Sequence, residues 1–151
     1  MSAIKRAMNR FPEMLLRSPL HGLMKNTLLI TFTGRKSGKT YTTPIVYLCE
    51  GEELLMTTDS PWWKNLHGGA PVILRIRGEE YPALGEAITD EVEVARVLER
   101  MLDEHPGYGK HVGLEPGERA DLARIEELAR GRVVIRARPA GTEGAAANPL
   151  K

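Results

Sequence analysis

Between residues 28 and 88, short apolar and β-branched stretches are bounded by turn residues, which is typical of β-strands, and residues 72–77 alternate apolar with basic as expected of a strand with one buried face. Turn residues at 50–52 and 78–79 separate neighbouring stretches and predict tight connections. Pro44 is expected at an edge or a bulge of its strand, and Pro82 and Gly85 are expected to interrupt the last strand. The pattern predicts strands over 28–33, 42–48, 54–58, 72–77 and 81–88.

The spacing of apolar residues becomes helical after residue 89. Thr89 or Asp90 is expected to cap a first helix that ends at residues 105–107, and a second helix is predicted over Pro116–Arg130. Residues 132–138 alternate again and predict a final strand. The residues expected to face inward are Val94, Val97, Leu98, Met101 and Leu102 on the first helix and Leu122, Ile125 and Leu128 on the second.

The order of these elements predicts one α+β domain over residues 26–140. Closely spaced antiparallel strands with helices kept to the ends favour a small barrel or a strongly curled sheet. Residues 2–17 are predicted to form a basic amphipathic helix, so that residues 1–25 are this helix and a linker. The tail over residues 141–151 is rich in Gly and Ala and is expected to be disordered.

Composition limits the function classes. The chain has 151 residues and a formal net charge of +1, which argues against a partner that is a nucleic acid. No apolar run approaches the roughly 20 residues that span a bilayer, and the basic start lacks the apolar stretch of a signal peptide. The single cysteine, Cys49, excludes an internal disulfide and suits a reducing compartment, so a cytoplasmic protein is expected.

The segment Gly34-Arg35-Lys36-Ser37-Gly38-Lys39 links two predicted strands and carries three cations and no acid. Its glycines allow successive backbone N–H groups to turn towards one point, and Arg35 and Lys36 add charge. The pattern predicts a site for a phosphate or a carboxylate. A solvated basic turn is the alternative that the sequence leaves open.

Two adjacent tryptophans, Trp62 and Trp63, must diverge whether their segment is extended or helical. One indole is therefore expected to fill core while the other lines a cleft, and a structural plug is the alternative. Asn65 is suited either to a ligand or to capping local backbone groups.

The turn at residues 105–108 and the nearby His111 are the other candidates for chemistry. Tyr108 offers a hydroxyl and a flat face, and a plain helix-end turn is the alternative for the histidines. Asp59 is more typical of a turn than of a catalytic base. No metal-ligand spacing and no nucleophile–base pattern stands out, so neither a metal site nor hydrolysis is expected.

Three motifs occur in a specific order: Thr33-Gly34-Arg35-Lys36-Ser37-Gly38 with a following Thr43-Pro44, then Trp62-Trp63-Lys64-Asn65-Leu66 with Gly69-Ala70-Pro71-Val72, then His105-Pro106-Gly107-Tyr108. Over residues 26–112 the chain resembles the deazaflavin-dependent nitroreductase and quinone reductase family. The resemblance implies a split β-barrel and coenzyme F-420, an 8-hydroxy-5-deazaflavin with a phosphate and a polyglutamate tail. It also implies hydride transfer from the reduced cofactor to a quinone-like or nitroaromatic acceptor.

The resemblance further implies roles for individual residues. The basic loop would hold the phosphate or acidic tail, the strand over 41–46 would run along the cofactor, and residues 57–59 would approach its ring. Tyr108 would lie on the substrate side as the catalytic residue. The implied cofactor-binding residues are Arg35, Lys36, Ser37, Tyr41, Thr43, Pro44, Ile45, Val46, Thr57, Thr58, Asp59, Trp62, Trp63 and Asn65.

Two other functions fit the same residues: an oxidoreductase that binds FMN, and a non-enzymatic flavin or deazaflavin carrier. The resemblance also implies a homodimer with the cofactor near the interface. The cations and apolar stripe of residues 2–17 suit either peripheral attachment to anionic lipid, which would make the protein membrane-associated, or packing over the barrel mouth.

Overall fold

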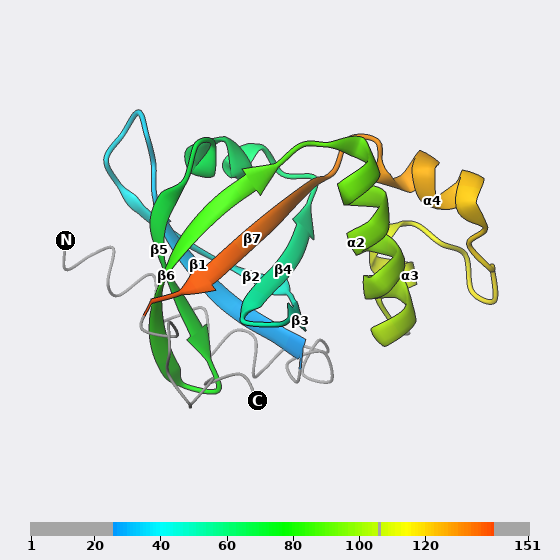
Figure 1. The fold of residues 1–151 in the computed structure, drawn as a ribbon, viewed down its shortest axis with the longest axis horizontal. Helices are drawn as coiled ribbons and strands as arrows, with labels where there is room; N and C mark the ends of the chain where they lie inside the picture. Colours follow the sequence, from blue (N-terminus) through cyan, green and yellow to red (C-terminus); the bar gives the residue numbers. More distant parts are fainter. Residues whose placement is uncertain (1–25, 106, 141–151) are drawn as a thin grey trace.

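The computed structural model describes residues 26–105 and 107–140, and Figure 1 shows a strongly curled sheet with helices to one side. Within these residues the sheet has seven antiparallel strands in the order β2-β1-β5-β6-β7-β4-β3. The strands are β1 (Thr27–Thr33), β2 (Thr40–Val46), β3 (Leu48–Glu50), β4 (Glu53–Thr58), β5 (Ala70–Ile76), β6 (Glu79–Ile88) and β7 (Val133–Pro139). The helices are the 3-10 helix η2 (Pro61–Leu66) and the α-helices α2 (Glu91–Glu104), α3 (Tyr108–Val112) and α4 (Leu122–Ala129).

The sheet curls until β2, at one edge, contacts β4 near the other edge. No ladder of backbone hydrogen bonds joins β2 to β4 within the described residues, so the barrel stays split along this seam. The α+β split barrel that the sequence predicts is therefore confirmed. Pro44 lies on β2, the edge strand, where a missing backbone N–H is tolerated.

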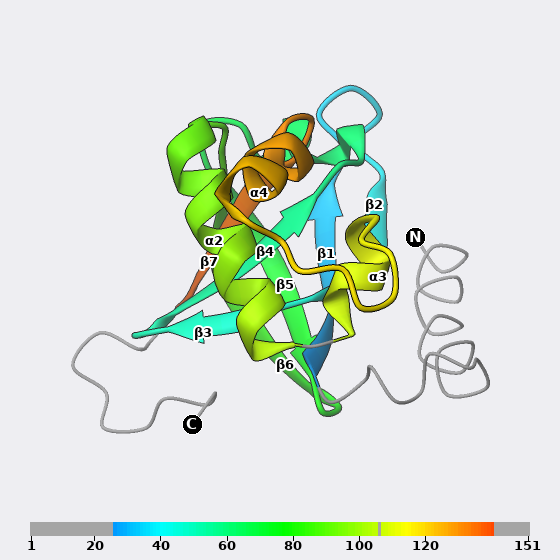
Figure 2. The same cartoon turned by 90° about the vertical axis from the view of Figure 1, so that its right-hand side faces the viewer.

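Two hydrophobic cores lie on the two faces of the sheet. Successive residues of a strand face opposite sides, so Leu54 and Met56 of β4 pack inside the barrel while Leu55 packs beneath α2. Figure 2 shows α2 lying across the sheet with α4 beside it. Both faces of β4 are thus covered, which explains why its sequence is apolar at consecutive positions.

The helix α2 follows its predicted pattern closely. The carboxylate of Asp90 caps its start by accepting a hydrogen bond from the backbone N–H of Glu93, at 3.0 Å. Four of the five residues predicted to face inward are buried, and Leu102 is half-buried: the buried ones are Val94, Val97, Leu98 and Met101.

The predicted second helix is wrong at its start, and one of its three predicted inward residues is exposed. The helix α4 begins only at Leu122, because Asp121 caps it by accepting from the backbone N–H of Arg124 at 2.8 Å. Leu122 is 65% exposed instead of inward, whereas Ile125 is buried and Leu128 is half-buried against the core, as predicted. Ala129 is buried as well. The short helix α3 was not predicted.

Two strand predictions also differ from the structure. The predicted strand over 42–48 is two strands, since β2 ends at Val46 and β3 begins at Leu48. β6 is not interrupted: Pro82 keeps its place opposite Ile73 in the register with β5, and its carbonyl accepts a hydrogen bond from the backbone N–H of Ala140 at 2.8 Å. A Cβ at Gly85 would lie 3.1 Å from Val72, so glycine lets β6 pack closely on β5.

The predictions for residues 1–25, including the amphipathic helix and its membrane contact, lie outside the described residues, as does the predicted tail at 141–151. In the part of the chain that the structure describes, no helix is long and apolar enough to cross a membrane.

Candidate active site

Trp62 lines two cavities at the top of the barrel. The first, the basic-loop cavity, has a volume of about 650 Å³, and its lining residues are Phe32, Gly34, Arg35, Lys36, Ser37, Tyr41, Pro61, Trp62, Lys64 and Asn65. The second, the seam cavity, has a volume of about 240 Å³ and lies where β2 faces β4 and α3. Its lining residues are Thr27, Thr43, Pro44, Ile45, Val46, Thr57, Thr58, Asp59, Ser60, Trp62, Tyr108, His111 and Arg132.

Every residue that the sequence predicts for the site lines one of these cavities, except Trp63. Trp63 is half-buried and packs against the barrel core. Trp62 packs against the same core but also lines both cavities, so the two indoles differ in their access to the cavities and not in their contact with the core.

The basic loop between β1 and β2 is closed by its own backbone. The N–H of Gly34 donates to the carbonyl of Lys39 at 2.7 Å, and the N–H of Gly38 donates back to Gly34 at 2.9 Å. The N–H of Lys39 donates to Ser37 Oγ at 3.2 Å. The N–H groups of Gly34, Gly38 and Lys39 are therefore occupied within the loop, so the predicted convergence of backbone donors is wrong at these positions.

Hydrogen bonds fasten the basic loop to η2. Asn65 Oδ1 accepts from the backbone N–H of Arg35 at 2.9 Å, while Asn65 Nδ2 donates to the carbonyl of Trp62 at 2.9 Å. The guanidinium of Arg35 donates through Nη1 to the carbonyl of Lys64, also at 2.9 Å. Asn65 therefore takes the backbone-capping role that the sequence left open, and it ties the loop to Trp62.

Aromatic rings form the wall under the basic loop. Trp62 stacks on Phe32 with ring centroids 4.8 Å apart, and Phe32 stacks on Tyr41 at 5.8 Å. The hydroxyl of Tyr41 lies 3.2 Å from Ser37 Oγ, within hydrogen-bond distance. The basic-loop cavity thus combines a flat apolar wall with cations at its rim.

A buried polar cluster closes the other end of the seam cavity. Tyr108 is 3% exposed, and its hydroxyl lies 2.6 Å from Thr57 Oγ1. Arg132 donates through Nε to Thr57 Oγ1 at 3.1 Å and through Nη2 to the Tyr108 hydroxyl at 3.4 Å. The tyrosine hydroxyl is thereby fixed between a neutral oxygen and a cation.

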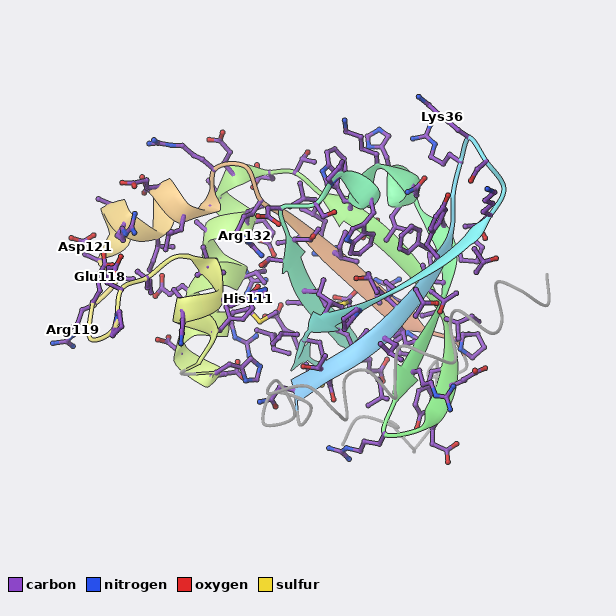
Figure 3. All side chains as sticks on the ribbon, turned by 180° about the vertical axis from the view of Figure 1, so that it is seen from behind. Lys36, His111, Glu118, Arg119, Asp121 and Arg132 are labelled. Atoms are coloured by element: carbon purple, nitrogen blue, oxygen red, sulfur yellow. The ribbon has the colours of Figure 1, made fainter. Side chains whose placement is uncertain are left out.

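Sequence reasoning missed Arg132 and gave His111 no definite role, yet both line the seam cavity. Figure 3 shows Lys36 on the loop that projects from the barrel, and Arg132 and His111 together between the barrel and the helices. Arg132 stands at the start of an alternating strand pattern, where a basic residue is ordinary. Nothing in its local sequence marks it, because its partners on β4 and α3 are distant along the chain.

The remaining candidates have structural environments. His105 lies 2.9 Å through Nε2 from the carbonyl of Tyr47, which supports the helix-end alternative. Burial raises the pKa of the Cys49 thiol and the nearby Glu104 raises it further, so a thiolate is disfavoured. Among the described residues, no three His, Cys, Asp or Glu side chains gather to hold a metal ion.

Replacing Thr57 with valine should cost about 1–3 kcal/mol of unfolding free energy, the usual penalty for buried groups left without a partner. Thr57 is 2% exposed, and valine keeps its shape while removing the oxygen that Tyr108 and Arg132 contact. Urea unfolding of the variant measures the change. Thr33→Val is the matched control, because Thr33 is exposed and should change stability by less than about 0.5 kcal/mol. Equal losses in both variants would contradict the role assigned to Thr57.

The described residues thus form a split barrel with a cationic loop and two adjoining cavities. The model of the F-420H(2)-dependent quinone reductase family matches residues 12–113, more than half of the chain. The chain belongs to this family. The deazaflavin-dependent reductase class and the coenzyme F-420 dependence that the sequence predicts are thus confirmed.

The chain is similar in fold to several solved structures. An F-420-H2 dependent reductase (FDR-A) has a TM-score of 0.50 and 17% identity, covering 75% of this chain and 94% of that chain. A structure described as a domain-swapped dimer has a TM-score of 0.51 and 16% identity, covering 88% and 97%. A candidate pyridoxamine 5'-phosphate oxidase from Listeria innocua has a TM-score of 0.51 and 14% identity, covering 80% and 90%. No curated protein sequence shows a significant match.

Proposed function

We propose that this reductase transfers a hydride from reduced coenzyme F-420 to a quinone-like acceptor, with nitroaromatic compounds as a second acceptor class. One observation carries the proposal: a cationic cavity and a ring-sized slot meet at Trp62. This arrangement suits a ligand with phosphate or carboxylate groups at one end and a flat polar ring at the other.

The residues of both cavities fit the cofactor chemically. Arg35, Lys36 and Lys64 give the basic-loop cavity three cations, and no acid occurs among the described residues that line it. A Cβ at Gly34 would lie 2.8 Å from both Ser37 Oγ and the Tyr41 ring, so any side chain there would displace these two residues of the cavity wall. The seam cavity has threonine hydroxyls at its edge and apolar β2 side chains along its wall, which suits a heteroaromatic ring.

The basic loop holds the acidic end of the cofactor in this proposal. Arg35 and Lys36 make charge-assisted contacts to phosphate or carboxylate oxygens, and Ser37 adds a hydroxyl donor. Tyr41 and Trp62 border the path from the loop to the slot, and Asn65 keeps Trp62 in place. The ring-binding residues are Thr43, Pro44, Ile45 and Val46 on β2 and Thr57, Thr58 and Asp59 at the end of β4.

Reduced coenzyme F-420, when bound, supplies the hydride. The chain's own residues orient the acceptor and exclude water from the slot, which gives much of the rate enhancement in such transfers. Tyr108 contacts the acceptor oxygen and stabilises the negative charge that develops there. Its hydroxyl is fixed by Thr57, and this prior orientation favours that role.

Fluorescence titration with oxidised coenzyme F-420, with FMN as competitor, tests the cofactor. Turnover of the reduced cofactor with a panel of quinones and nitroaromatic compounds tests the reaction. We expect tight deazaflavin binding, weak competition by FMN and quinone-dependent oxidation. Protein that is purified with bound FMN and has no deazaflavin affinity would be the FMN oxidoreductase instead. Protein that binds the deazaflavin and reduces no acceptor would be a carrier.

A homodimer is a further part of the proposal. The fold shared with a structure described as a domain-swapped dimer supports it, and so does the position of β2 at an edge of the sheet. Sedimentation velocity measures the mass directly, and a monomer at every protein concentration would contradict this part alone.

A further inference from the structure

Arg132 is a buried cation in the wall of the seam cavity with little to neutralise it. Its side chain is 10% exposed, and Asp59 is the one carboxylate within 4.0 Å of it among the described residues. That contact is long, at 3.8 Å from Nη1 to Asp59 Oδ2, and the Asp59 side chain is 76% exposed. An exposed carboxylate at such a distance contributes little electrostatic stabilisation to the charge of Arg132. Buried charges are normally paired, so this one calls for a partner that arrives with a ligand.

Neutral oxygen atoms accept hydrogen bonds from Nε and Nη2 of Arg132, and none accepts from Nη1 among the described residues. Nε donates to Thr57 Oγ1 at 3.1 Å, and Nη2 donates to the Thr57 carbonyl at 3.3 Å and to the Tyr108 hydroxyl at 3.4 Å. An arginine has five N–H donors, and the two on Nη1 make no hydrogen bond to any of the described residues. Nη1 lies on the side of Asp59, which lines the same cavity.

We propose that Arg132 binds, through Nη1, the acceptor oxygen that becomes negatively charged during reduction; this rests on the proposed function for the identity of the acceptor. Arg132 lies beyond residues 12–113, which the family model matches, so the assignment comes from this chain's own geometry. The bound acceptor is a quinone or another conjugated carbonyl compound that forms a phenolate-type oxyanion.

The reaction balances with a solvent proton. One carbonyl oxygen of the quinone receives the hydride, and the electron pair released through the ring moves onto the opposite carbonyl oxygen. That oxygen becomes a phenolate, and water then protonates it to give the hydroquinone. The guanidinium interacts more strongly with the phenolate than with the neutral carbonyl, and such a difference lowers the barrier.

Binding of 4-nitrophenol to the cofactor-free protein tests the site without any turnover. The acid and the anion of this probe absorb light differently, so one titration reports both affinity and the form that binds. We expect the wild type to bind the anion preferentially and to lower the apparent pKa of the probe. Arg132→Met should bind the anion at least tenfold more weakly and lose the preference.

Matched variants separate charge from packing. Arg132→Lys keeps a charge but lacks the planar fork, so an intermediate affinity is expected. Asp59→Asn removes the competing carboxylate and should strengthen anion binding severalfold. Arg130→Met removes an exposed charge two positions away and should change nothing. If Arg132→Met does not fold, Arg132→Lys and Asp59→Asn still move affinity in opposite directions.

Equal anion affinity in the wild type and Arg132→Met would overturn the inference. So would a loss caused by Arg35→Ala with Lys36→Ala and not by Arg132→Met, because the probe would then occupy the basic-loop cavity. With the reduced cofactor, Arg132→Met should lower kcat with little change in the KM for the quinone. Arg132→Lys should have a kcat between those of Arg132→Met and the wild type. Absence of deazaflavin binding, with phenolate binding still dependent on Arg132, would defeat the proposed function and leave this site standing.

Discussion

Replacing Arg35 and Lys36 together with alanine is expected to weaken the binding of oxidised coenzyme F-420 by about a hundredfold or more. Each charge-assisted contact contributes about 1.5–3 kcal/mol, and both side chains are exposed, so the lower end applies to each. A total of about 3 kcal/mol corresponds to roughly a hundredfold change in Kd. Loss of Arg35 also removes the bond from its guanidinium to the carbonyl of Lys64, which loosens the loop from η2.

Fluorescence titration measures this loss, and the same loop provides the control. Lys39 is an exposed cation of the loop that does not line the basic-loop cavity, so Lys39→Ala should change affinity far less. Wild-type affinity should also fall as salt is added, because screening weakens exposed charge pairs. Unchanged binding in the double variant, or an equal loss in Lys39→Ala, would show that the loop acts only through its overall charge or not at all.

Leu66→Ala is expected to cost about 2–5 kcal/mol of unfolding free energy, the range for large apolar side chains removed from a packed core. Leu66 is fully buried and is the residue that anchors η2 in the barrel core, where it packs near Gly85. Because η2 carries Trp62 and Asn65, the variant should also bind the cofactor more weakly at temperatures where it remains folded.

Thermal and urea unfolding measure the stability loss, and Leu122→Ala is the control. Leu122 is the same residue type on α4 but is 65% exposed, so its removal should cost less than about 0.5 kcal/mol. A Leu66 variant that loses stability but keeps full cofactor affinity would show that η2 holds Trp62 without this anchor.

The strands and α2 were predictable because each has a regular pattern of apolar residues that faces one core or both. Alternation located β5 and β7, short apolar stretches between turn residues located β1 and β4, and a helical stripe with an Asp90 cap located α2. Prediction failed where a long-range contact decides the local structure. The continuity of β6 through Gly85 depends in this way on the approach of Val72 from β5. The late start of α4 has a local cause, because Asp121 caps the helix through the backbone N–H of Arg124.

The residues of the candidate site likewise fall into those that a local sequence motif predicts and those that only the fold brings into place. Arg35, Lys36 and Trp62 belong to compact sequence motifs, and the structure gathers them around one cavity. Arg132 has no motif, since its partners Thr57 and Tyr108 come from β4 and α3. Its relation to the seam cavity arises only when β7 pairs with β4, which places residue 133 beside Thr58.

The split between β2 and β4 has a consequence for how a flat molecule enters. No backbone hydrogen bonds join these strands within the described residues, so separating them there would break none of the sheet's ladders. Entry of a flat ligand along this seam would therefore cost no main-chain hydrogen bond, unlike entry through the wall of a closed barrel.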